Sequence, residues 1–134
     1  MSSKNRLPIL PIILSFVSLV SGCAISPERM SELPDLNVCR SLAVFGFAGG
    51  APYKQEIIRR NLLTQEEWAL VAEGKISRGM SQCAMYVSWG TPHRENRSVG
   101  DWGVHIQHVY GEGGKYRSVS YVYTENGKVS SWQD

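Results

Sequence analysis

Three cysteines and three histidines are the side chains of this chain that could carry covalent or metal chemistry. His105 and His108 are three residues apart on a segment with strand-like alternation, so they point to opposite faces of a sheet and do not easily share a metal ion. Cys83 with His93 or His105 would make a thiol–imidazole pair, but Cys83 falls in the first turn of a predicted packed helix. We therefore predict no catalytic residue, no metal site and no cofactor.

The first 22 residues have the composition of a secretory signal peptide. Lys4 and Arg6 precede an apolar segment from Leu7 to Val20, which is too short for an ordinary membrane-spanning helix and has the length of a signal-peptide core. Residues 1–22 contain these two cations and no acid, so removing them takes the formal net charge from +2 to zero. The basic pI therefore comes from the leader and gives no reason to expect a nucleic-acid partner.

The sequence Val20-Ser21-Gly22-Cys23 closes this segment. It resembles the bacterial lipobox, in which an aliphatic residue and two small residues precede a cysteine that receives a diacylglycerol, followed by cleavage before that cysteine. The resemblance implies a signal peptide over residues 1–22, lipidation of Cys23 and a lipid-anchored protein. Because Ala24 and not Asp follows the cysteine, it also implies the periplasmic face of the outer membrane. A secreted protein without lipid is the alternative.

Cys39 and Cys83 remain as a possible pair if Cys23 carries lipid. Both fall on predicted helices, and an oxidising compartment would allow a disulfide between them. Two buried thiols are the alternative, because spacing alone does not fix a pairing.

The hydrophobic pattern changes its period at Pro92. A polar tether is predicted over residues 23–35, followed by one α+β domain over residues 36–134. Its helices are predicted at 36–45, 52–63, 64–74 and 82–88, and its strands at 94–99, 102–110, 116–124 and 128–133. The prediction is thus N-terminal helices followed by a helix and an antiparallel β-meander of three to four strands.

Local signals place the ends of these elements. Asp35 and Ser81 are predicted helix caps, and Thr64 with Glu67 forms a capping-box pattern. Asn126-Gly127 is a strong signal for a two-residue hairpin. We also predict an i,i+4 pair of Glu56 with Arg60 and apolar helix sides that include Ile58 and Ala72. The second predicted strand begins at Trp102. The third has Val119, Tyr121 and Tyr123 on its apolar face, which the preceding helices are predicted to cover.

Several short segments between residues 74 and 134 follow a family pattern. They are Gly74-Lys75-Ile76, Arg78-Gly79-Met80-Ser81, Ser88-Trp89-Gly90-Thr91-Pro92 and Glu125-Asn126-Gly127-Lys128-Val129. This part resembles the SmpA/OmlA family of small outer-membrane lipoproteins of the BamE type. The chain after Cys23 is most similar to an uncharacterised group of proteobacterial lipoproteins with a BamE-like C-terminal half. The resemblance implies helices packed on an antiparallel sheet, as in half of a β-lactamase-inhibitor protein.

The expected function is a non-enzymatic interaction module for outer-membrane assembly or integrity, with the membrane and other envelope proteins as partners. A tethered periplasmic inhibitor or ligand-binding module is the alternative, because the implied fold is inhibitor-like. The outward face of the sheet is the predicted binding surface, around His105, Gln107, Tyr116 and Arg117. Surface aromatic residues and arginine are typical interface anchors. A solvated face without a partner is the alternative reading of these residues.

Overall fold

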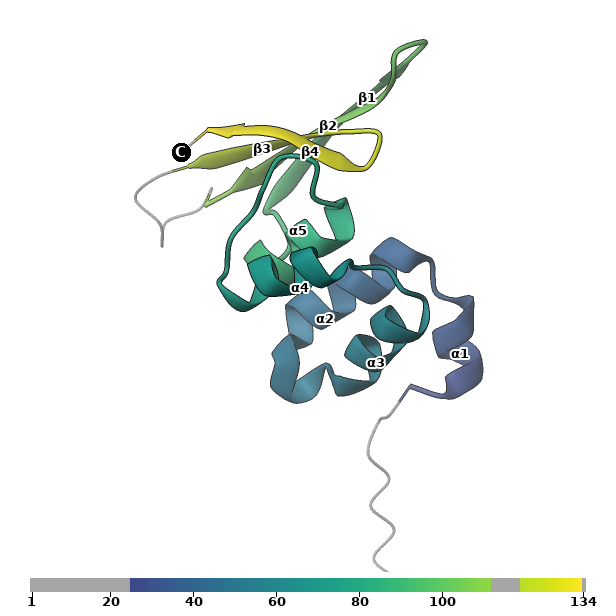
Figure 1. Ribbon diagram of the computed structural model, residues 1–134. Coiled ribbons are helices and arrows are strands. Elements are labelled where there is room, and N and C mark those ends of the chain that lie inside the picture. Colours follow the sequence, from purple (N-terminus) through teal and green to yellow (C-terminus); the bar gives the residue numbers. More distant parts are fainter. Residues whose placement is uncertain (1–24, 112–118, 134) are drawn as a thin grey trace, which may run out of the picture.

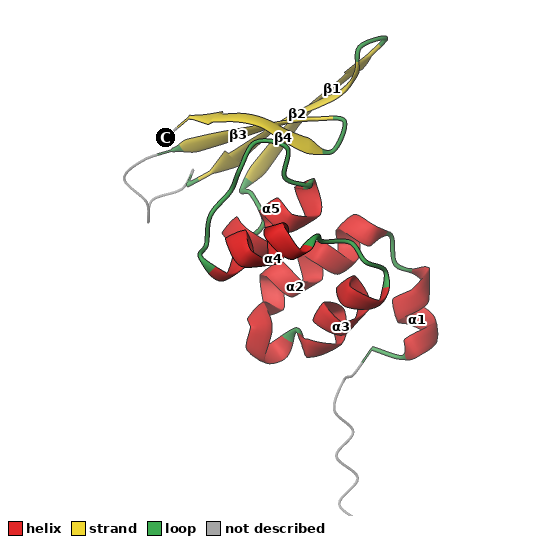
Figure 2. Ribbon diagram, viewed as in Figure 1, coloured by secondary structure: helices red, strands yellow, loops and turns green. Residues whose placement is uncertain are grey.

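The computed structural model describes residues 25–111 and 119–133. Helices come first and a four-stranded antiparallel sheet follows, which confirms the predicted α+β class (Figures 1 and 2). The helices are α1 (Pro27–Glu32), α2 (Asp35–Gly49), α3 (Ala51–Arg59), α4 (Gln65–Ala72) and α5 (Gln82–Trp89), and the strands are β1 (Arg94–Gly100), β2 (Gly103–Tyr110), β3 (Ser120–Glu125) and β4 (Lys128–Gln133). In these ranges no helix has both the length and the apolar character needed to cross a bilayer.

The sheet is a meander in which each strand pairs with the next. Asn126 and Gly127 form the β3–β4 turn with φ of 50° and 78°, the positive values that a two-residue hairpin turn requires. The predicted hairpin is confirmed. At the other hairpin Gly100 pairs with Gly103, so Trp102 lies in the turn and is not the start of the strand. Its ring is exposed there because neither face of the sheet covers a turn residue.

Helix α5 lies between the sheet and α2. In Figure 1, α4 and α5 lie next to the sheet, while α1, α2 and α3 form a layer farther from it. Nearly all of α5 is buried, as expected for a helix with neighbours on both sides. The fully buried residues of this core include Val38, Cys39 and Leu42 of α2, Ala84, Met85 and Tyr86 of α5, and Val122 of β3.

Helices α4 and α5 begin at side-chain caps. The Thr64 hydroxyl accepts from the Glu67 amide, and a Glu67 carboxylate oxygen accepts from the Thr64 amide, so the predicted capping box is confirmed. The second carboxylate oxygen of Glu67 accepts from the amide of Ser81, which itself caps α5. One buried carboxylate therefore fixes the starts of two consecutive helices.

The predicted tether over residues 23–35 is partly wrong, because α1 forms within it. Ser26 caps this helix, accepting from the Arg29 amide, and Pro27 occupies its first turn, where a missing amide hydrogen costs nothing. Met30 is buried against the domain core. The segment has few apolar residues, but Met30, the partly buried Ile25 and Leu33 and a distant arginine dock this short helix on the domain.

That arginine is Arg60, which joins α3 to the start of the chain. Its guanidinium donates to the main-chain oxygens of Met30 and Leu33 at 2.8 and 2.7 Å and to the Asp35 carboxylate at 2.8 Å. Asp35 is thus the first residue of α2 and a partner of Arg60, not the predicted cap. The predicted Glu56–Arg60 pair is confirmed at 2.6 Å.

Three predicted faces are corrected by the structure. Ile58 and Ala72 are exposed, because Ile57 and Val71 occupy the core side of their helices and the next residue is about 100° away. On β3 the core side carries Val122 and the buried Thr124. Tyr121 and Tyr123 therefore lie on the outward face, where a ring with a polar tip can stay partly wet.

Candidate functional site

The outward face of the sheet carries a row of side chains that bond to one another across the strands. The amide of Asn96 on β1 donates to the Gln107 side-chain oxygen on β2 at 2.8 Å. The Gln107 amide donates in turn to the Tyr123 hydroxyl on β3 at 3.1 Å. Ser131 on β4 is the register partner of Tyr123. We call Asn96, Gln107, Tyr123 and Ser131 the outer row.

A shallow pocket of about 300 Å³ lies along this face. The residues that line it are of polar types apart from Ile106, and they include Asn96, His105, Gln107, Tyr123, Glu125 and Ser131. His105 has Ser98 and Glu125 as its register partners on the two neighbouring strands. The face thus offers uncharged donors and acceptors in ordered positions, with one imidazole and one carboxylate at its edge. Such groups suit recognition of polar surfaces more than bond-breaking chemistry.

Two of the four predicted surface residues, His105 and Gln107, are brought together on this face, and Tyr116 and Arg117 lie outside the described residues. The sequence prediction did not include Asn96 or Tyr123. The signal that could have found them is the strand register. Once the two-residue turn is placed at Asp101-Trp102, counting back pairs Asn96 with Gln107.

A second polar group lies on the inward face, between the sheet and the helices. His108 is fully buried on β2. Its Nδ1 lies 2.8 Å from a Glu95 carboxylate oxygen, and its Nε2 lies 2.9 Å from the Thr124 hydroxyl. Since the carboxylate can only accept, Nδ1 carries the hydrogen and Nε2 accepts from Thr124. His105 and His108 therefore point to opposite faces of the sheet, as their spacing predicts.

Glu95 also ties the sheet to helices α2 and α5. The Tyr86 hydroxyl donates to one Glu95 oxygen, and the Arg40 guanidinium donates to the other at 2.6 Å. The Tyr86 oxygen accepts from Arg40 at 3.0 Å and from the Gln82 amide at 2.5 Å. We call Arg40, Tyr86, Glu95, His108 and Thr124 the inner cluster. It joins two helices and three strands, with the Glu95 carboxylate at its centre and Thr124 attached through His108.

The protonation states of the inner cluster follow from its burial and its charges. Burial lowers the pKa of His108, against the opposing effect of Glu95, so its imidazole is neutral. Burial would raise the pKa of Glu95, but the hydrogen bond from the Tyr86 hydroxyl and the charge and hydrogen bond of Arg40 outweigh it and lower that pKa. Burial raises the pKa of Tyr86. Arg40 and Glu95 are therefore a charged pair, and the other members are neutral.

Cys39 and Cys83 connect two helices next to the inner cluster. The sulfur atoms of Cys39 and Cys83 lie at disulfide-bonding distance, with the two Cα atoms 5.3 Å apart. The bond joins α2 to α5, the same two helices that Arg40 and Tyr86 connect. In this bonded state Cys83 has no thiol to pair with an imidazole. Cys23, the predicted lipidation residue, lies outside the described residues. Within the described ranges, no three His, Cys, Asp or Glu side chains are grouped so that they could hold a metal ion.

Comparison with protein-family models, curated proteins and solved structures finds no match to this chain. The resemblance to BamE-type lipoproteins therefore stays a prediction.

Proposed function

We propose that the protein is a lipid-anchored, non-enzymatic interaction module of the bacterial envelope that binds another envelope protein through the outward face of its sheet. The observation that supports this most is the outer row, in which Asn96, Gln107 and Tyr123 hold one another in place on an accessible surface. Side chains that are already ordered lose less conformational entropy on binding. A preformed polar row is therefore favourable for recognition.

The other side of the sheet supports this assignment by making the surface rigid. His108 and Glu95 alternate along their strands with outer-face residues, and the inner cluster fixes them to α2 and α5. The Cys39–Cys83 bond holds the same two helices together. A binding surface is most precise when a well-packed layer supports it.

The shape of the outer face favours a macromolecular partner over a small ligand. Small-molecule sites usually enclose most of the ligand, whereas this pocket of about 300 Å³ lies open along the sheet. A protein partner could cover the whole row and exclude water from it. A tethered ligand-binding or inhibitor module is the second candidate, and the polar lining of the pocket is the observation that favours it.

A photo-crosslinking amino acid at Ser131 in the full chain tests the binding face. We expect a discrete adduct with a membrane-fraction protein, and we expect Gln107→Ala to reduce its yield because the row is interrupted. The same probe at Glu66, an exposed residue of α4, is the matched control. Equal adducts at Ser131 and Glu66 would contradict the proposal. An adduct with a soluble periplasmic enzyme or a cell-wall fragment would favour the second candidate.

The anchor has its own test. Cys23→Ser should leave the chain uncleaved and release it from lipid attachment, because the thiol is the acyl acceptor. Mass spectrometry of the N-terminal peptide and membrane fractionation measure these two effects. Unchanged processing and unchanged membrane association in the variant would show that the lipobox interpretation is wrong.

A further inference from the structure

The last part of α2, where the chain kinks at Gly46 and then turns at Gly50 into α3, exposes a set of large apolar side chains. Val44, Phe45 and Phe47 are 66%, 58% and 51% exposed. The segment from Ser41 to Tyr53 that contains them has no charged side chain. An exposed apolar surface of this kind is typical of a contact site, because a solvated turn normally carries polar residues.

These aromatic residues are held in place at the surface. Gly46 has φ of 67°, a left-handed value that breaks the helix between the two phenylalanines. The Phe45 ring stacks on the Tyr53 ring in a parallel arrangement, with the two ring centres 5.6 Å apart. A Cβ atom on Gly50 would lie 2.5 Å from the Gly46 carbonyl oxygen, so glycine is needed there for the chain to pass. The backbone is therefore built to present the rings outward.

A cation lies at the edge of this surface. The ammonium group of Lys54 lies 5.3 Å from the centre of the Phe47 ring and 5.9 Å from that of Trp68. Among the described residues no carboxylate pairs with it. Aromatic rings beside a lysine whose stem is apolar and whose tip is charged are characteristic of side chains at a membrane interface.

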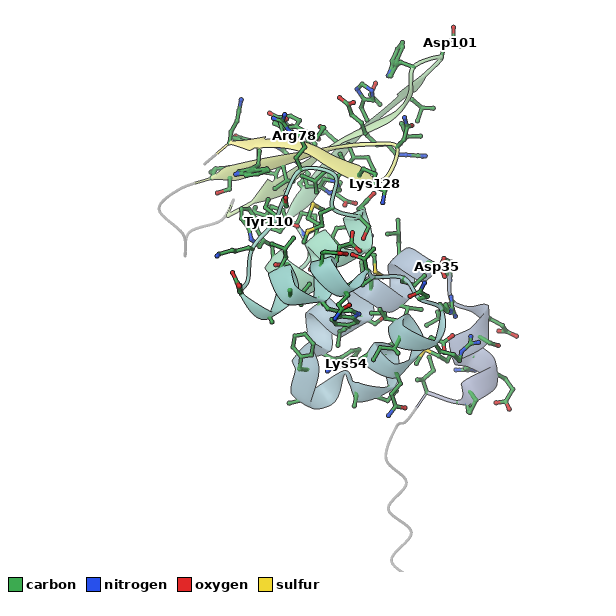
Figure 3. All side chains as sticks on the ribbon, viewed as in Figure 1. Asp35, Lys54, Arg78, Asp101, Tyr110 and Lys128 are labelled. Atoms are coloured by element: carbon green, nitrogen blue, oxygen red, sulfur yellow. A yellow bond between two sulfur atoms is a disulfide. The ribbon has the colours of Figure 1, made fainter. Side chains whose placement is uncertain are left out.

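The turn lies at the same end of the molecule as the start of the described chain. Ile25 and Pro27 line a pocket together with Pro52 and Gln55, so the start of α1 lies beside the start of α3. In Figure 1 both are on the side of the helical layer away from the sheet, and Figure 3 shows Lys54 in that layer, far from Asp101 at the tip of the sheet.

The reach of the chain then fixes what can cover this surface. Cys23 is two residues before Ile25, which allows at most about 7 Å between their Cα atoms. The rest of the predicted tether is folded as α1 and held by Arg60, so it supplies no extra length. A lipid on Cys23 would therefore bring this end of the helical layer against the bilayer.

We propose that Val44, Phe45, Phe47 and Lys54, the turn patch, lie on the phospholipid surface, with the outer row turned away from it toward the periplasm. This rests on the lipid anchor of the proposed function. The aromatic rings insert at the boundary between headgroups and acyl chains, and Lys54 faces the phosphates. The short lipid connection and the turn patch together make a two-point attachment that sets the orientation of the domain.

The test is footprinting of the full-length protein reconstituted in vesicles of phosphatidylethanolamine and phosphatidylglycerol. Mass spectrometry first establishes whether Cys23 carries lipid, and hydroxyl-radical labelling then compares protein in vesicles with protein in lipid-free solution after enzymatic removal of the acyl chains. We expect loss of labelling at Phe45, Phe47 and Tyr53 in vesicles, with Trp102 and Tyr123 unchanged. A lipidated protein whose turn patch is labelled as strongly in vesicles as in solution overturns this inference and leaves the anchor intact. An unlipidated Cys23 overturns both.

Two variants separate lipid contact from other contacts. Phe45→Ser/Phe47→Ser should restore labelling of Tyr53 in vesicles, whereas Val99→Ser/Trp102→Ser, which removes equally exposed apolar side chains from the far hairpin, should not. The fold of each variant is checked by its urea midpoint. The measurement is repeated at several protein-to-lipid ratios. Protection that is independent of the ratio supports a lipid contact, and protection that grows with protein density shows a second copy of the chain and overturns the proposal.

Discussion

His108 and Glu95 lie opposite each other on β2 and β1, with Nδ1 of the imidazole 2.8 Å from the carboxylate oxygen. The imidazole is fully buried, while the carboxylate is one quarter exposed. The pair therefore places a neutral ring inside the domain and a charge at its edge. Arg40 balances that charge from the helical side.

This arrangement predicts a loss of stability in mild acid. Burial lowers the pKa of His108 from its ordinary value of 6.5, so the unfolded chain takes up a proton that the folded chain resists. The free energy of unfolding should fall as the pH drops below about 6.5. The depressed pKa of Glu95 adds a further loss only at still lower pH, below its ordinary value of 4.5. Urea denaturation at a series of pH values measures both ranges.

Two variants make the assignment specific. His108→Gln should flatten the dependence above pH 5, about one and a half units below the ordinary histidine pKa. His93→Gln, at an exposed position, should leave it as in the native chain. An unchanged slope in His108→Gln would show that another group titrates.

The docking of α1 depends on Arg60. Arg60→Met should release this helix, because it removes the donors to the carbonyl oxygens of Met30 and Leu33 while keeping an apolar stem. We expect faster hydrogen–deuterium exchange over residues 27–33, measured by mass spectrometry, with smaller changes in α5. Arg59→Met is the matched control, because Arg59 pairs with the same Glu56 but, among the described residues, donates no hydrogen bond to α1. Equal exchange in the two variants would assign the docking of α1 to its apolar contacts alone.

The bond between Cys39 and Cys83 should contribute strongly to stability. It closes a loop with a sequence separation of 44, for which the loss of unfolded-state entropy gives about 3 to 4 kcal/mol. Cys39→Ala/Cys83→Ala should lower the free energy of unfolding by this order. The urea midpoint, with and without a reductant, measures it. A native chain whose midpoint does not respond to reductant would instead carry two buried thiols.

The prediction from sequence was best where one local signal decides the structure. The capping box at Thr64, the cap at Ser81 and the turn at Asn126-Gly127 each require a particular residue at one position, and all three are present. The change of the hydrophobic period after Pro92 also separated the predicted helices from the predicted strands, because it depends only on residues that are neighbours in the sequence. Such signals need no knowledge of the rest of the fold.

The prediction failed where distant residues decide. The helix α1 is held by Arg60, which is about 30 residues away and gives no local signal. The inner cluster could not be foreseen, because Arg40, Tyr86 and His108 meet only after the helices pack on the sheet. On β3 the aromatic residues suggested the buried face, but Thr124 is buried instead since His108 satisfies its hydroxyl.

The Cys39–Cys83 bond also defines how the molecule would carry mechanical load. A pull between the N-terminal end and the sheet would run along α1 and the first turns of α2 to Cys39, across the sulfur atoms, and through α5 into β1. The covalent bypass leaves α3 and α4 outside the line of force. The segment with the turn patch would therefore stay folded while the sheet is under tension, for as long as the sulfur–sulfur bond is intact.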